Sequence, residues 1–164
     1  PRWKERHKSI PRAKDVQRQK NIASEALTAF TPAAIDRMAQ TRIKQLVVFH
    51  NVAYALGDKL VTFSLDDDDK QRDVYTHELA HYVDYGPSQY RKDLLSSKPA
   101  WQEAWKKEIV EPQRVSSYAA WDAAEGFAEF FRMLHGLGSS ADGRRTITQA
   151  FPRCVSFLES EGLW

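Results

Sequence analysis

The chain contains very little cysteine: Cys154 is a single cysteine among 164 residues. One cysteine excludes an internal disulfide, and it excludes a zinc cluster built from several thiolates. Both the cytosol and an extracellular setting remain compatible with this composition, because some secreted proteins fold without disulfides. Cysteine content therefore restricts the chemistry more than it restricts the compartment.

Long apolar runs are also lacking. A membrane-spanning helix takes about 20 apolar residues, and no stretch of this chain approaches that length. No charged-then-apolar leader of the secretory type is present, although a start at Pro1 leaves room for a removed leader or an upstream domain. With 42% hydrophobic residues and a mean hydropathy of −0.59, the sequence is typical of a soluble protein with one core.

The net charge of +2 hides an uneven distribution. Residues 1–20 hold eight basic and two acidic side chains, so this segment is strongly positive and the remainder is negative. A basic arm of this kind can contact nucleic acid or an anionic membrane, but a solvated arm is the simpler interpretation. We therefore divide the chain into a basic N-terminal arm, 1–20, and one domain, 21–164.

Hydrophobic periodicity and branched residues predict the secondary structure. Residues 15–30 show a helical pattern, and a short helix is expected after Thr31 as N-cap with Pro32 at its first position. Branched residues within 43–65, separated by a turn at "ALGD", predict a hairpin or two strands of a small sheet. The acidic run Asp66–Asp69 favours the start of a helix. Further helices are expected at about 70–85, 88–95, 99–110, 121–136 and 143–160, the last interrupted near Pro152. One small sheet followed by several helices predicts an α+β domain.

The segment "VYTHELAHYVDYG", residues 74–86, holds two histidines four residues apart. Positions four apart share one face of a helix, so His77 and His81 can offer ring nitrogens to one ion. Glu78 stands beside the first histidine, where a general base can take a proton from water on the ion. The alternative is that HExxH arose by chance and that the histidines are ordinary surface residues.

A third ligand has to come from elsewhere. The metzincin pattern is excluded, because Asp84 and Pro87 occupy the places of its glycine and third histidine. Asp84 lies too far along the helix to close a tetrahedral site easily, so we expect it to orient a histidine from behind. Glu125 and Glu129 lie four apart among apolar residues on a predicted helix, which suits a ligand and an acceptor behind a metal-bound histidine. The resulting ligand set is His77, His81 and Glu125, two histidines and a glutamate; a pair of surface glutamates is the alternative.

The two segments "VYTHELAHYVDYG" and "SSYAAWDAAEGFAEFFRMLHG" resemble the catalytic core of the anthrax lethal factor family, which includes the Pro-Pro endopeptidases. The resemblance rests on HExxH followed three residues later by Asp84, on the E-x-F-A-E pattern of Glu125 to Glu129, and on Tyr118 seven residues before Glu125. It covers roughly residues 59–160 and is weak before residue 40.

The resemblance implies a zincin-like metallopeptidase domain, in which a small mixed sheet precedes a mainly helical lobe carrying the HExxH helix. It implies zinc held by His77, His81 and Glu125, with Glu78 as general base and Tyr118 stabilising the charge on the carbonyl oxygen. The substrate would be a peptide lying as an extended strand along an edge strand at Lys59–Leu65, and the Pro-Pro endopeptidases in the family raise the expectation of cleavage at proline-containing sites. A secreted protein is favoured on the same ground. The alternatives are a zinc-bearing binding module without hydrolytic activity and the catalytic fragment of a larger toxin.

Overall fold

The computed structural model describes residues 13–40, 45–49, 54–56, 59–63, 67–86, 93–111, 115–137 and 140–164. The α-helices in these ranges are α1 (Ala13–Leu27), α2 (Pro32–Ala39), α3 (Asp68–Tyr85), α4 (Pro99–Trp105), α5 (Ala123–Leu137), α6 (Ala141–Ala150) and α7 (Pro152–Ser160). A 3-10 turn, η2 (Leu95–Ser97), precedes α4, and a π-helical turn, η3 (Lys106–Val110), follows it. The strands, of which only the backbone is described, are β1 (Gln45–Phe49), β2 (Tyr54–Leu56) and β3 (Lys59–Phe63).

The first two helices follow the sequence signals closely. The side chain of Thr31 accepts a hydrogen bond from the Ala34 backbone N–H, and Pro32 is the first residue of α2, which confirms the predicted cap. Helix α1 runs across the boundary that the charge pattern placed between residues 20 and 21. Gln19, from the segment expected to be an arm, is buried and accepts a hydrogen bond from the Tyr75 hydroxyl at 2.7 Å. Residues 1–12 lie outside the described residues.

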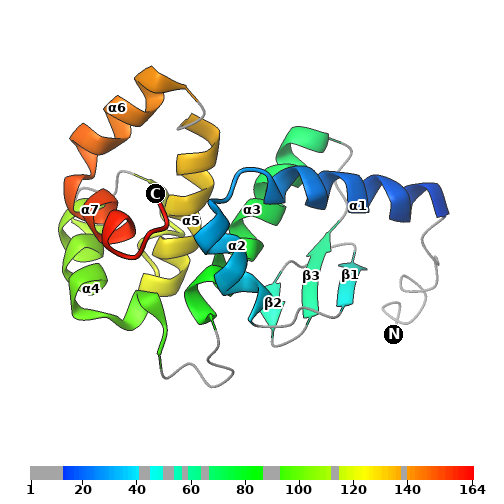
Figure 1. The fold of residues 1–164 in the computed structure, drawn as a ribbon, viewed down its shortest axis with the longest axis horizontal. Helices are drawn as coiled ribbons and strands as arrows, with labels where there is room; N and C mark the ends of the chain where they lie inside the picture. The colour runs from blue at the N-terminus through cyan, green and yellow to red at the C-terminus, as the bar shows by residue number, and fades with distance from the viewer. Residues whose placement is uncertain are drawn as a thin grey trace.

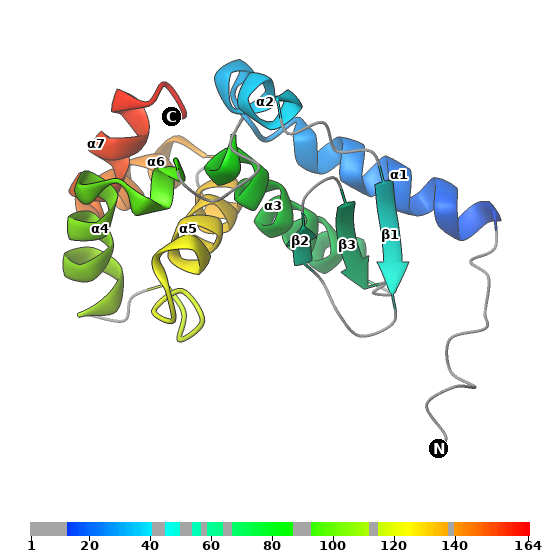
Figure 2. The same ribbon diagram turned by 90° about the horizontal axis from the view of Figure 1, so that it is seen from below.

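Three short strands form one sheet in the order β1-β3-β2. Strand β2, which the sequence analysis did not predict and which includes Ala55 and Leu56 of the expected turn, pairs antiparallel with β3. Strand β1 pairs parallel with β3. The two stretches of branched residues therefore run in the same direction and do not form a hairpin with each other. Figure 2 shows β1 and β2 as the two outer strands.

The fold class expected from the sequence, α+β with a small mixed sheet, is corrected here to a mainly helical one. Among the residues whose side chains the structure describes, 78% lie in helices and none lies in a strand. The strands are only three to five residues long, whereas the buried apolar side chains of the described residues come from the helices and the turns between them. Local β propensity in 43–65 is real, but the core that stabilises the described part of the molecule is built by helix packing.

The predicted substrate edge also needs correction. Strand β3 is the central strand of the sheet and has a partner on both sides. Its backbone ladder is therefore occupied, and a peptide cannot add to it as a further strand. Residues 64 and 65 of that predicted edge lie outside the described residues.

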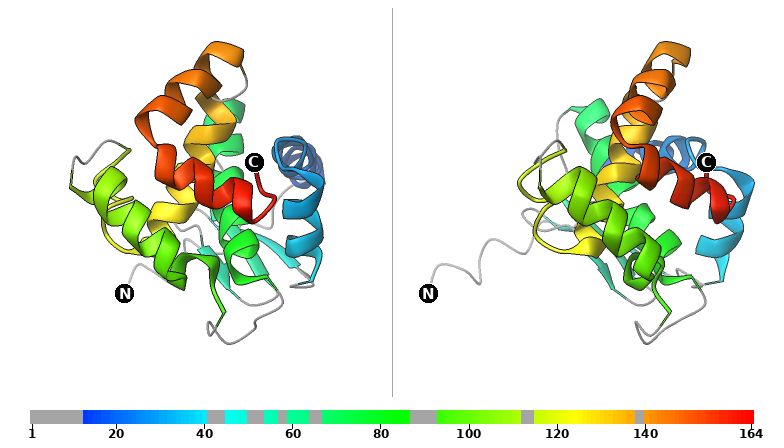
Figure 3. Two further views of the ribbon diagram at one scale, coloured as in Figure 1. Left: turned by 60° about the vertical axis from the view of Figure 1, so that its left-hand side comes forward. Right: turned by 90° about the vertical axis from the view of Figure 1, so that its left-hand side faces the viewer.

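Helices α3 and α5 lie side by side at the centre of the molecule (Figure 1). The sheet and α1 lie on one side of this pair, and α4, α6 and α7 lie on the other, where α7 crosses close to α4 (Figure 3). The predicted break of the last helix is confirmed, because α6 ends at Ala150 and α7 begins at Pro152. Of the helix expected at 88–95, residues 88–92 lie outside the described residues and Leu95 starts the η2 turn.

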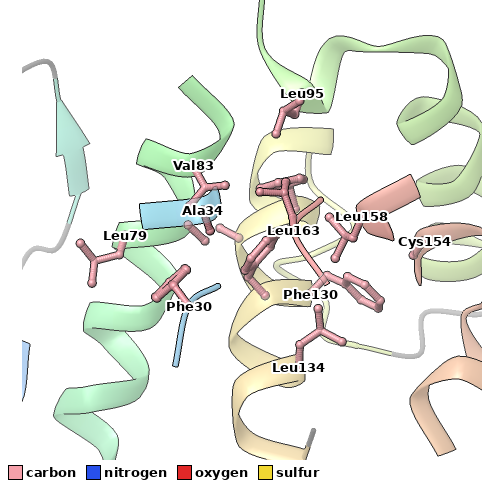
Figure 4. Close-up of a cluster of buried hydrophobic side chains, with 14 of the residues drawn as sticks. Phe30, Ala34, Leu79, Val83, Leu95, Phe130, Leu134, Cys154, Leu158 and Leu163 are labelled. Carbon is pink, nitrogen blue, oxygen red and sulfur yellow. The ribbon is translucent and has the colours of Figure 1, made fainter. Parts of the chain in front are cut away.

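The core of the helical part is aromatic. Trp101 packs against Phe127, Phe130 and Phe157 with ring centroids 5.1, 6.0 and 5.5 Å apart, and its indole N–H donates to the Ala123 carbonyl at 2.9 Å. Leu79 and Val83 of α3 extend the core toward Phe30 and Ala34 (Figure 4). Both sides of the α3–α5 pair are therefore anchored, so side chains between the two helices are held in place.

Among the described residues, no helix combines the length and apolarity needed to cross a membrane.

Candidate metal centre

Helix α3 begins at Asp68, within the acidic run and slightly before the expected start at about residue 70. The carboxylate of Asp67 is the N-cap and accepts from the backbone N–H groups of Asp69 and Lys70 at 3.0 and 3.1 Å. Asp68 and Asp69 lie in the first turn, where negative side chains interact favourably with the positive end of the helix dipole and stabilise the helix. Every residue from Tyr75 to Asp84 is buried, because α3 has the sheet and α1 on one side and α5 on the other.

Helix α5 supplies the facing wall. Asp122 precedes it and accepts hydrogen bonds from the backbone N–H groups of Ala124 and Glu125 at 2.8 and 2.9 Å. The apolar side chains of Phe127, Phe130 and Leu134 face the core. Glu125 and Glu129, one helical turn apart, lie on the side that meets α3.

The two helices bring His77, His81 and Glu125 together. The Oε2 atom of Glu125 lies 3.2 Å from Nε2 of His77 and 3.4 Å from Nε2 of His81, and one ligand atom from each residue lies within 4.8 Å of the others. Donors on a tetrahedral zinc ion, each about 2.0–2.1 Å from it, are roughly 3.3 Å apart. Two histidines and a glutamate from this chain therefore have a spacing that fits zinc.

Unpartnered polar atoms collect at the same place. Oε2 of Glu78, Oε2 of Glu125 and Nδ1 of His81 are buried and have no hydrogen-bond partner among the described residues. A buried polar atom left without a partner costs about 1–3 kcal/mol. A cation held by Glu125, with water beside Glu78, would satisfy the two carboxylate oxygens, which supports the fit of the donor set. Nδ1 of His81 is on the ring edge opposite Nε2 and would not contact that ion.

The pKa shifts show that the cluster attracts positive charge. Burial alone would lower the pKa of His77, but the carboxylates of Glu125 and Glu129 outweigh it and raise that pKa to about 9. Burial alone would raise the pKa of Glu125, but the imidazoles of His77 and His81, whose Nε2 atoms lie 3.2 and 3.4 Å from its Oε2, hold it far below its usual range. A divalent cation would satisfy the same electrostatic demand in place of a proton.

Glu78 has a different environment from Glu125. Burial raises its pKa, and this effect exceeds the opposing influence of the two imidazoles. Its side chain is buried beside the histidine pair, as HExxH spacing predicts, with one oxygen free of any described partner. A carboxylate with a raised pKa and a free oxygen is suited to accept and return a proton.

Glu129 lies behind His77, in the position that the sequence analysis gave it. Its Oε1 is 2.9 Å from Nδ1 of His77, which holds the proton on Nδ1 and leaves Nε2 free to face Glu125. Arg132 donates to both oxygens of Glu129 at 3.0 Å, and the Ser116 hydroxyl donates to Oε2 at 2.9 Å. The carboxylate is therefore fixed from three sides.

Asp84 differs from its expected role. Its carboxylate accepts from the backbone N–H and the hydroxyl of Ser96, both at 2.7 Å, and Nδ1 of His81 has no partner among the described residues. The prediction that Asp84 hydrogen-bonds a histidine is corrected: Asp84 ties the end of α3 to the η2 turn. The reason is that one further turn of α3 carries it past the histidines toward that segment.

Tyr118 lies on the exposed side of the cluster. Its ring centroid is 5.8 Å from that of His77, and it is 43% exposed, whereas the two histidines and Glu78 are buried. Partial burial and the nearby carboxylate of Glu125 raise the pKa of the phenol, so it keeps its proton. A protonated phenol at this position can donate to an oxygen that gains negative charge.

Sequence reasoning missed Ser116, Arg132 and Ser96. Arg132 lies three residues after Glu129 on one helix, a spacing that favours an ion pair and could have revealed it. Ser116 and Ser96 lie outside the α-helices, and no sequence spacing connects them to the carboxylates that they contact.

The chain was compared with models of known protein families, with curated proteins and with solved structures, and none of the three comparisons finds a match.

Proposed function

We propose that the protein is a zinc-dependent endopeptidase, with His77, His81 and Glu125 as the metal ligands. The observation that carries this proposal is the convergence of these three donors at tetrahedral spacing beside a buried glutamate with a free oxygen. When bound, zinc supplies Lewis acidity, which lets water lose a proton near neutral pH and polarises a carbonyl group.

The chain's own residues carry the proton transfers. Glu78 accepts a proton from the attacking water and returns it to the amine that leaves when the peptide bond breaks. Its burial raises its pKa, which makes it a stronger base than a solvated glutamate. Once protonated, the same side chain can donate the proton to the leaving amine. Tyr118 donates its hydroxyl proton as a hydrogen bond to the carbonyl oxygen as negative charge develops there.

Glu129, Arg132 and Ser116 position His77 rather than touch the substrate. Their hydrogen bonds keep the imidazole in one tautomer and one orientation, and such partners typically change metal affinity by about 10–100-fold when removed. The expectation that a peptide extends the sheet at β3 is not part of this proposal, because β3 is paired on both sides.

The test combines metal content with cleavage of a diverse peptide library that includes proline-containing sequences. We expect one zinc per chain by elemental mass spectrometry and library cleavage detected by peptide mass spectrometry. The variant Glu78→Gln should retain the zinc and lose cleavage by about 10²-fold or more, because the general base is gone while the ligands remain.

Three outcomes separate the alternatives. Full cleavage by Glu78→Gln would contradict its role as base. Zinc at one per chain with no cleavage of any library member would favour a binding module without hydrolytic activity. Failure to bind zinc would overturn the metal site itself.

A further inference from the structure

Trp121 is unusually exposed for its type. Its relative exposure is 77%, and no other large hydrophobic side chain among the described residues exceeds 43%. Tryptophan buries more apolar area than any other residue when covered, so leaving it in water is unfavourable. Exposed tryptophan beside a functional site commonly serves as a contact for a partner or substrate.

A row of rings connects Trp121 with the metal cluster. The centroid of His81 is 5.0 Å from that of His77, His77 is 5.8 Å from Tyr118, and Tyr118 is 5.6 Å from Trp121. Exposure rises along the row, from 8% at His77 to 43% at Tyr118 and 77% at Trp121. The row therefore leads from the buried donors to solvent.

The backbone around Trp121 is held at both ends. Its N–H donates to the Tyr118 carbonyl at 3.0 Å, and the next residue, Asp122, caps α5. The preceding turn is tied to α4 through the Trp105 indole, which donates to the Ala119 carbonyl at 2.8 Å. A fixed backbone reduces the entropy lost when a ligand packs on the indole.

We propose that Trp121 is a specificity-determining residue that binds an aromatic or large aliphatic side chain of the substrate; this rests on the proposed peptidase function. The two ring contacts, end to end, place the indole no more than about 11 Å from the His77 ring. An extended peptide advances about 3.3 Å per residue. The side chain that meets Trp121 therefore lies within about three residues of the scissile bond.

The test uses the zinc-loaded full chain and matched peptide pairs. Library cleavage first identifies a preferred sequence and the position near the scissile bond where a large apolar residue is favoured. Peptides are then made that carry either Phe or Ala at that position. For the wild type we expect kcat/KM for the Phe peptide to exceed that for the Ala peptide by about tenfold, the value of a good aromatic contact. Trp121→Ala should remove this ratio mainly through KM, and Trp121→Phe should retain most of it.

Leu27→Ala is the control, because it removes another exposed apolar side chain, on α1, far along the chain from the site. It should leave the Phe-to-Ala ratio unchanged. An unaltered ratio in Trp121→Ala, an equal loss for both peptides, or a wild-type preference for Arg or Lys at this position would overturn the role of Trp121 while leaving the peptidase intact. Absence of cleavage by the zinc-loaded wild type would overturn the proposed function and this inference with it.

Discussion

Glu129 is a carboxylate that orients His77 without touching the proposed substrate. It accepts hydrogen bonds from His77, Arg132 and Ser116, and it is itself buried. Burial alone would raise its pKa, but these partners bring it down to about 2. The side chain is therefore a permanent negative charge behind the imidazole, which would strengthen His77 as the proposed metal ligand.

Glu129→Gln should therefore weaken zinc binding by about 10–100-fold. The amide keeps the shape of the side chain but loses the charge that holds the Nδ1 proton of His77. Zinc affinity measured by competition with a chromogenic chelator reports the change directly. Glu159→Gln, an exposed glutamate on α7, is the matched control, and equal affinity in the two variants would contradict the role of Glu129.

His135 is a titratable residue that the proposed mechanism does not use. It packs between Phe30 and Phe131, with ring centroids 4.7 and 5.7 Å away, and its buried Nε2 has no partner among the described residues. Burial lowers its pKa from 6.5 to about 4. The folded protein therefore holds this imidazole neutral over a range in which the unfolded chain protonates it.

The consequence is a loss of stability in acid. Because the pKa of His135 is lower in the folded state, the unfolded chain takes up a proton at a higher pH than the folded protein does. The free energy of unfolding is therefore unaffected by this group above pH 6.5 and decreases as the pH drops from 6.5 toward 4. His135→Phe should reduce this acid sensitivity by about 2 kcal/mol between pH 7.5 and 4.5. Urea unfolding of both proteins with a chelator present removes any contribution from the metal. Parallel stability curves for the two proteins would show that His135 does not contribute.

At the scale of elements, α5 and the turn before it meet at Gly126. A Cβ atom at this position would lie 2.5 Å from the Trp105 indole and 2.9 Å from the Ala119 carbonyl. These two groups are hydrogen-bonded to each other, and together they set the position of the turn that carries Tyr118 and Trp121. Glycine at 126 is therefore required by close approach, not by backbone conformation.

Gly126→Ala should displace that turn, because the clash involves a backbone oxygen as well as a side chain. We expect a destabilisation of about 1–3 kcal/mol, the usual cost of overpacking, and a loss of peptidase activity while zinc binding persists. Gly136→Ala is the control, since a Cβ there meets nothing within 4 Å. Thermal unfolding and library cleavage measure the two effects, and wild-type values for Gly126→Ala would mean that the turn adapts freely.

At the scale of the whole molecule, the proposed metal site joins the two central helices. His77 and His81 belong to α3 and Glu125 belongs to α5, so an ion held by all three links the part that carries the sheet to the C-terminal helices. A ligand that binds only the folded state adds stability according to its concentration over its dissociation constant, about 4 kcal/mol at a thousandfold excess.

Removing zinc with a chelator should therefore lower the melting temperature by about 10 °C for a chain of this size. Readdition of zinc should restore it. The double variant His77→Ala, His81→Ala lacks two of the ligands and should melt at the same temperature with and without chelator. An equal chelator effect on the double variant would place the stabilising ion elsewhere.

Local physics made much of the candidate site predictable. Helical periodicity alone puts His77 next to His81 and Glu125 next to Glu129. Capping chemistry located the start of α2 at Thr31, and the acidic run Asp66–Asp69 indicated roughly where α3 begins. These features depend on residues within one or two turns of each other. The sequence of each segment contains everything that is needed to place them.

The fold class and the hydrogen-bonded surroundings of the site depended on contacts between distant segments. The parallel pairing of β1 with β3, the predominance of helices in the core, and the meeting of Ser96 with Asp84 and of Ser116 with Glu129 follow from how whole elements pack. Periodicity determines which face of a helix is polar, but it does not determine which neighbour covers that face. By itself the sequence determined the chemical groups and their local spacing, and the tertiary structure decided which partners orient them, because long-range proximity is set by packing across the entire core.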